Sequence, residues 1–221
     1  SGTDEAFFAR HRYNVDRFRI SGGPVVLRNM DFSALEDRTA FHVGVIDVDA
    51  LDLDILSNRR LRPDPSTQRP QMLNTIARTL PFRLAVDSVR TRHTTITYGE
   101  RWPNSSVPAT LRWTDVRTTI TGLQNANAAH APLTLSARGT FQGQSTMDAT
   151  FVIPLTSSVY TVDARGSLGR FDVTSLNSFL PIAENVRIRS GVATSATFTY
   201  SVRGRACTGT VSPHFTNLRI D

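Results

Sequence analysis

The chain has 221 residues, which is enough for one large β domain with a hydrophobic core or for two small domains. A hydrophobic fraction of 39% and a charged fraction of 20% do not fit a disordered chain. The net charge is +6, and all the basic residues are arginine, with no lysine. The arginines are spread from Arg10 to Arg219 and are not clustered with aromatic residues, so we expect no nucleic-acid partner. Attraction to anionic lipid head groups stays open, because it needs the same sign of charge.

The first strands are predicted from residue 13 onward. Residues 13–20 alternate apolar and polar side chains with the period of a strand, and residues 25–27 resume the strand after the turn signal Gly22-Gly23-Pro24. In residues 41–56 the alternation slips by one residue at Ala50-Leu51. A β-bulge or a bend at that point would return the apolar side chains to one face of the sheet.

Helical spacing occurs at two places. Residues 71–80 predict a short helix that Pro81 ends, after a loop at 59–70 that is rich in proline and arginine. Residues 175–180 predict a second helical turn, which we expect Pro181 to stop. We treat residues 1–221 as a single β-rich segment, in which the loop plus short helix at 57–80 is a candidate internal boundary.

The rest of the chain is predicted to form short strands separated by turn residues. The predicted strands cover residues 83–90, 94–98, 110–122, 133–142, 145–154, 160–168, 186–189, 192–203 and 206–221. Short strands at nearly regular spacing predict a mainly β fold, a meandering antiparallel sheet with one or two short helices.

Three segments, residues 15–27, 86–98 and 184–194, resemble one another. Each has a polar residue, a strand in which apolar residues and arginine alternate, a tight turn and a second strand, which predicts a repeated hairpin unit. Such a unit cannot bury its apolar face alone and must stack on copies of itself. Any antiparallel sheet can also produce degenerate matches of this kind.

Several patches that span most of residues 13–220 have the pattern of a known family, and the more specific ones are Tyr98-Gly99-Glu100-Arg101 and Leu176-Asn177-Ser178-Phe179-Leu180-Pro181. In these patches the chain resembles the AsmA-like superfamily of bacterial envelope proteins, which includes TamB. The resemblance implies a long, twisted, taco-like sheet with an apolar groove that carries phospholipid or another acyl lipid between membranes, or that supports outer-membrane biogenesis.

The same resemblance implies a location and partners. We expect a periplasmic protein of a Gram-negative cell envelope, tethered to the inner membrane by an anchor outside this segment, with other envelope proteins as further partners. The chain is short for a bridge across the periplasm, so it would supply one section of a groove. The alternative is a structural or protein-interaction β domain with a closed core and no lipid ligand.

A lipid groove needs a sheet with one apolar face that no second layer fills. The candidate lining residues alternate along four predicted strands, and they are Leu111, Trp113, Leu133, Leu135, Phe151, Ile153, Leu155, Phe198, Tyr200 and Val202. The same residues would also suit the core of a closed sandwich, so the pattern leaves both readings open.

Motifs for catalysis or metal binding are not recognisable in the sequence. The five histidines are scattered, and Ser145 lacks the glycine spacing of a nucleophile elbow. Four aspartates between residues 47 and 54 could bind Ca²⁺, but their alternation along a strand favours a solvated face. We therefore expect no enzyme and no cofactor. Cys207 is expected to be a small buried residue.

Overall fold

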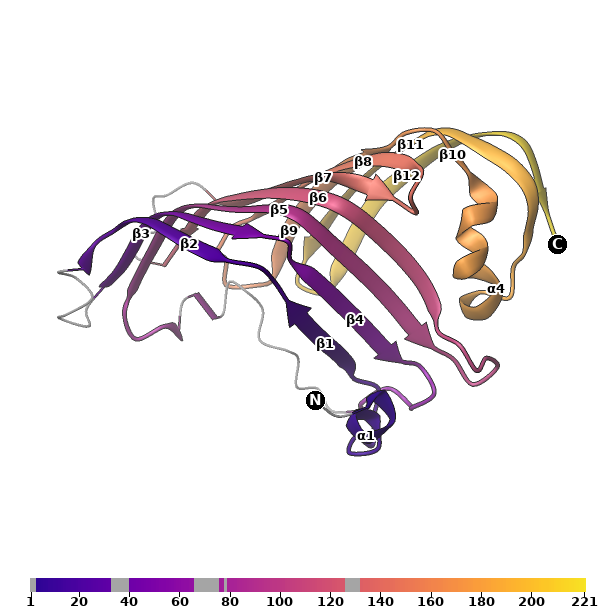
Figure 1. Ribbon diagram of the computed structural model, residues 1–221, viewed down its shortest axis with the longest axis horizontal. Coiled ribbons are helices and arrows are strands. Elements are labelled where there is room, and N and C mark those ends of the chain that lie inside the picture. The colour runs from indigo at the N-terminus through magenta and orange to yellow at the C-terminus, as the bar shows by residue number, and fades with distance from the viewer. Residues whose placement is uncertain (1–2, 33–39, 66–75, 78, 126–131) are drawn as a thin grey trace.

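The chain folds into one open, curved sheet of twelve strands, with the short helices of residues 173–183 on its concave side (Figure 1). The computed structural model describes residues 3–32, 40–65, 76–77, 79–125 and 132–221. The strands are β1 (Asp16–Ser21), β2 (Val25–Met30), β3 (Ala40–Asp49), β4 (Asp52–Asn58), β5 (Arg83–Arg101), β6 (Ala109–Gln124), β7 (Leu133–Phe141), β8 (Ser145–Ile153), β9 (Thr161–Leu168), β10 (Phe171–Asp172), β11 (Ile188–Arg203) and β12 (Ala206–Ile220). The helices are α1 (Asp4–Phe8), η1 (Val173–Ser178) and α4 (Leu180–Ala183).

The strands are nearly all antiparallel to their neighbours. One edge of the sheet consists of β1 and β2, which pair with β4 and β3. Both β3 and β4 pair in parallel with the long strand β5, one after the other along its length. The sheet then continues through β6, β7, β8, β9 and β11 to β12 at the opposite edge, with the short β10 beside β11. The predicted mainly β, antiparallel fold is thus confirmed.

The curvature of the sheet coincides with irregular residues in neighbouring strands. Ala50, His93 and Asp115 have positive φ angles of 50°, 49° and 48°. The pairing register shifts beside His93 and Asp115, and β3 ends at Asp49 before β4 begins at Asp52. Bulges of this kind bend a strand and increase its twist. The bulge or bend predicted at Ala50-Leu51 is confirmed.

Glycine allows close packing at this bend. A Cβ on Gly139 of β7 would lie 2.7 Å from Cγ2 of Val116 on β6, well inside the van der Waals distance of two carbon atoms. Val116 is buried, so its side chain occupies the space that a larger residue at position 139 would need.

The hairpins predicted within residues 15–27, 86–98 and 184–194 are not formed, although the consecutive strands from β5 to β9 do pair as antiparallel neighbours. Residues 86–98 lie within the single strand β5, and β1 and β2 pair with different strands instead of with each other. In the third segment, Gly191 has a φ of 142° inside β11. The three segments therefore share an interruption of the strand pattern. Sequence similarity alone does not distinguish a kink within one strand from a turn between two paired strands.

The two helical predictions fare differently. Ile76, Ala77 and Thr79 are helical, whereas residues 71–75 and 78 of the predicted helix lie outside the described residues. The turn expected at 175–180 is present as η1, but Pro181 does not stop it, because it lies in the first turn of α4. Proline is tolerated there since the first amide groups of a helix have no helical acceptor.

Candidate functional site

Apolar side chains on one face of the sheet form rows that cross the strands. Residues paired between neighbouring strands point to the same face, so the register defines each row. One row runs through Leu27, Ile46, Val89, Ile120, Leu135, Phe151, Ala164, Tyr200 and Gly209. The next runs through Val25, Val48, Thr91, Thr118, Ala137, Ala149, Gly166, Phe198 and Val211. The rows extend from β2 to β12 across the whole width of the sheet.

This apolar face is the concave one, because η1 and α4 pack against it beneath the arch in Figure 1. Its middle is an open groove of about 390 Å³. The lining comes from β4 to β8 and consists of Ile55, Ile96, Tyr98, Trp113, Val116, Thr118, Leu135, Ala137, Arg138, Gly139, Met147, Ala149 and Phe151. The side chains at its floor are nearly all apolar, so the groove offers an acyl chain burial but little hydrogen bonding.

The ten candidate lining residues fall into four parts of this face. Trp113, Leu135 and Phe151 line the open groove. Leu133, Ile153, Leu155 and Val202 belong to a cluster at one end, where Ala77 covers the sheet. Leu111 belongs with Trp113 to a second cluster under η1 and α4. Phe198 and Tyr200 stack on each other, with ring centroids 6.3 Å apart, further along the rows on β11.

Ile55, Ile96, Tyr98 and Met147 also line the groove, but they were not predicted from the sequence. Ile55 follows the break in the apolar–polar alternation at Ala50, so the face of the sheet on which its side chain lies depends on the backbone geometry at that break. Ile96 and Tyr98 lie just past the second bulge, at His93. The alternation of apolar residues was the available signal, but a bulge reverses its phase.

A polar network adjoins the groove at the end of β5. Glu100 is buried, with 6% of the residue exposed, and its carboxylate is the centre of the network. It accepts hydrogen bonds from Tyr98 Oη at 2.6 Å, from Trp102 Nε1 at 2.8 Å and from Arg59 Nη2 at 2.9 Å. Burial opposes ionisation, but these donors outweigh it and lower the pKa of Glu100 below its ordinary value. Burial and the bond to Glu100 raise the pKa of Tyr98, so Tyr98 stays a neutral donor.

The segment η1–α4 is fixed over the other part of the face by side-chain hydrogen bonds. Asn177 donates to the carbonyl of Ile188 at 2.8 Å and accepts from its amide at 2.9 Å, in place of a strand partner. Ser178 donates to the carbonyl of Thr110 at 2.8 Å. The Phe179 ring lies 6.3 Å from the ring of Tyr98. Both motifs of the family resemblance therefore meet at this end of the groove.

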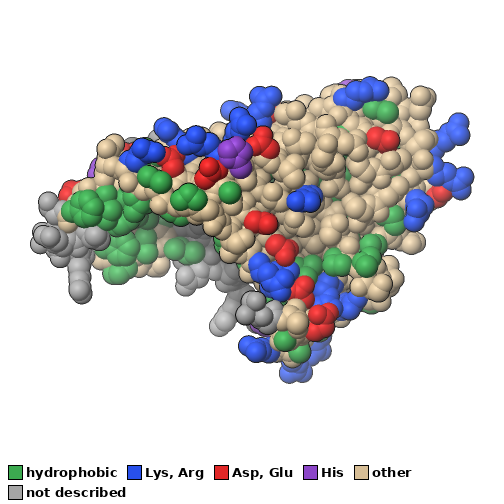
Figure 2. Space-filling model, in the orientation of Figure 1, with side chains coloured by type: hydrophobic (Ala, Val, Ile, Leu, Met, Phe, Trp, Pro, Cys, Tyr) green, Lys and Arg blue, Asp and Glu red, His purple; other side chains and the backbone are tan. Residues whose placement is uncertain are grey.

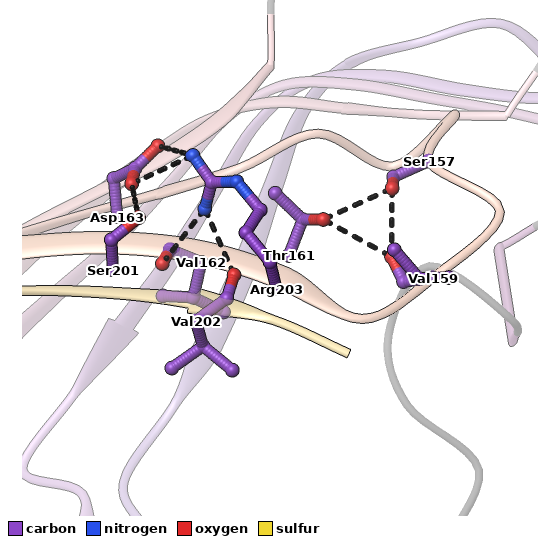
Figure 3. A network of polar contacts seen from close by, with 8 residues as sticks. All are labelled: Ser157, Val159, Thr161, Val162, Asp163, Ser201, Val202 and Arg203. Atoms are coloured by element: carbon purple, nitrogen blue, oxygen red, sulfur yellow. Dashed lines mark hydrogen bonds and ion pairs between the residues drawn. The ribbon is translucent and has the colours of Figure 1, made fainter. Parts of the chain in front are cut away.

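The convex face of the sheet is polar, in contrast to the apolar groove on the concave face. Figure 3 shows one of its networks, in which Asp163 accepts two hydrogen bonds of 2.9 Å from Arg203 and one of 2.6 Å from Ser201. The bonds from Arg203 and Ser201 lower the pKa of Asp163. A shallow hollow of about 570 Å³ lies beside it, lined largely by threonine and serine together with Arg165.

Three of the four aspartates between residues 47 and 54 contact arginine or histidine side chains. Asp47 accepts from Arg28 at 3.1 Å, Asp49 pairs with His93 at 2.8 Å, and Asp54 pairs with Arg17 at 3.0 Å. Among the described residues, no three His, Cys, Asp or Glu side chains are placed to hold a metal ion together. The expected burial of Cys207 is wrong: the residue is exposed, because β12 is an edge strand with one neighbour.

The part of the chain that the structure describes contains no helix long and apolar enough to cross a membrane. The sequence matches no protein-family model, and it has no significant similarity to a curated protein. A reading of function therefore depends on the groove and on the residues that surround it.

Proposed function

We propose that the chain is a non-enzymatic, AsmA-like segment of a bacterial envelope protein, which binds or conducts phospholipid along its apolar groove. In this proposal it acts in the periplasm between the inner and outer membranes and supports outer-membrane biogenesis. The supporting observation is the apolar rows that cross the sheet from β2 to β12 on its concave face. An apolar strip of this length suits a chain-like ligand that lies across the strands.

The ends of the rows support the same reading. Leu27 at one edge is 44% exposed, and Val211 at the other is 71% exposed. Monomeric soluble proteins rarely leave contiguous apolar surface uncovered without a binding role. Figure 2 shows hydrophobic side chains along the edge at β2, above the hollow underside of the molecule. A lipid that enters at one edge would meet apolar surface throughout.

The experiment is detergent-free purification from a Gram-negative host, followed by native mass spectrometry and lipid extraction. We expect phospholipid that remains bound through gel filtration and is released by organic solvent. Protein free of lipid, which also takes up none from vesicles, would contradict the proposal.

A second candidate is a structural domain that pairs with another protein through a sheet edge. The fifteen residues of β12 have a strand on one side only, and Phe215 is 44% exposed. Such an edge can accept a further strand. Capture of a protein partner by lipid-free protein, lost on deletion of β12, would favour this candidate.

A further inference from the structure

Arginine side chains gather at one end of the sheet, where β4 and β5 end and where the segment that follows α1 lies. We call this group, Arg10, Arg12, Arg60 and Arg62, the arginine tip. All four side chains are exposed. Figure 2 shows basic side chains at the bottom of the view, where Figure 1 places α1.

The arginine tip is one unit built from two loops. The guanidinium groups of Arg12 and Arg62 lie 5.7 Å and 5.2 Å from the ring centroid of Tyr13. The amide of Asn14 donates to the carbonyl of Arg62 at 2.8 Å, which joins the loops. Arg60 donates to the carbonyl groups of Trp102 and Ser105, at 3.1 Å and 2.6 Å, and so connects them to the β5–β6 hairpin.

The positive charge of the arginine tip is only partly offset by the carboxylates around it: Glu5 is near enough to Arg60 for their attraction to contribute to the lowered pKa of Glu5. Asp4 pairs with Arg17 and Arg19, Glu5 pairs with Arg101, and Glu100 pairs with Arg59; these partners are all outside the four. In the described part of the chain, no ion pair joins a carboxylate to Arg10, Arg12, Arg60 or Arg62.

The surroundings of the tip match a lipid–water interface. Tyr13 and Trp102 are partly exposed beside the arginines, and Val107 in the hairpin is 60% exposed. Aromatic rings with a polar end and arginines with long apolar stems both suit the head-group layer of a bilayer. Tyr98, which lines the groove, donates to Glu100, and Glu100 also accepts from Arg59, the residue before Arg60 of the tip.

We propose that the arginine tip docks on the surface of an anionic phospholipid bilayer and points the groove toward it. The docking stands on charge and exposure alone. Only the further step, passage of lipid between that bilayer and the groove, rests on the proposed function.

The test is co-sedimentation with vesicles of phosphatidylcholine alone or mixed with phosphatidylglycerol. The full chain is compared with a variant that carries R10Q, R12Q, R60Q and R62Q. The control carries R90Q, R112Q, R165Q and R170Q, four exposed arginines elsewhere on the molecule, so its net charge changes by the same amount.

We expect the unaltered chain to bind the anionic vesicles and to be released by added salt. The tip variant should bind roughly several hundred-fold more weakly, since each of the four basic side chains near an anionic surface contributes about fivefold to binding. The control should stay within a few-fold of the unaltered chain. Equal losses in the two variants, or no preference for anionic vesicles, would overturn the docking proposal.

Binding of a fluorescent fatty acid, measured without vesicles, separates the two proposals. If the tip variant still binds this probe but not vesicles, both proposals are supported. If no form of the protein binds the probe while docking depends on the tip, the lipid groove is wrong and the docking surface stands.

Discussion

Filling the groove floor should abolish lipid binding without unfolding the sheet. Ala137 lies in the groove between Thr118 and Ala149 in a cross-strand row. A tryptophan at this position would project its ring into a space of about 390 Å³. If the ring displaces roughly four methylene groups at ~0.8 kcal/mol each, binding weakens by ~3 kcal/mol, or about a hundred-fold in Kd.

The neighbouring residue provides a matched control. Ser136 is on the same strand but is exposed on the convex face, so Ser136→Trp adds the same side chain outside the groove. Titration of both variants with a fluorescent phospholipid measures the difference, and circular dichroism shows whether the sheet is intact. Equal affinities for the two folded variants would refute the groove as the binding site.

Three further substitutions test the contacts around the groove, each by urea unfolding. Glu100→Gln should lower the free energy of unfolding by about 2 kcal/mol near neutral pH through weaker hydrogen bonds. Because the pKa of Glu100 is lowered in the folded protein, the stabilisation from its charged form is complete above the ordinary value of 4.5 and is lost as the pH falls below it. The stabilities of the variant and the unaltered chain should therefore converge in acid. Gly166→Ala should cost about 1–3 kcal/mol, because its Cβ would collide with the Phe198 ring and lie 2.5 Å from the carbonyl oxygen of Asp148. Asn177→Ala should cost about 2 kcal/mol, since it leaves both backbone groups of Ile188 without their partner; a cost under about 0.5 kcal/mol in any of the three would contradict the assigned contact.

The strand content and the bulge at Ala50 were predictable, because both follow from local alternation and its phase. The choice of strand partners was not. β1 and β2 bond to β4 and β3 instead of to each other, and the parallel pairing of β3 and β4 with β5 joins segments far apart in sequence. Such pairings depend on long-range contacts that a local pattern does not encode.

The candidate site was predictable in part for the same reason. Trp113, Leu135 and Phe151 alternate cleanly within regular strands, and they line the groove. Leu133 and Ile153 have the same local pattern but are buried at the end of the face that Ala77 covers. Which apolar residues stay open depends on where η1, α4 and the segment at Ala77 pack, and alternation within a strand carries no information about that.

The most direct test of the lipid groove is photo-crosslinking with a phospholipid that has a diazirine in its acyl chain. After irradiation and digestion, mass spectrometry locates the modified residues. We expect crosslinks at Ile96, Trp113, Leu135 and Phe151 on the concave face, reduced by unlabelled phospholipid and by Ala137→Trp. Crosslinks spread equally over convex residues such as Ser136 and Thr150, or none at all, would contradict the account.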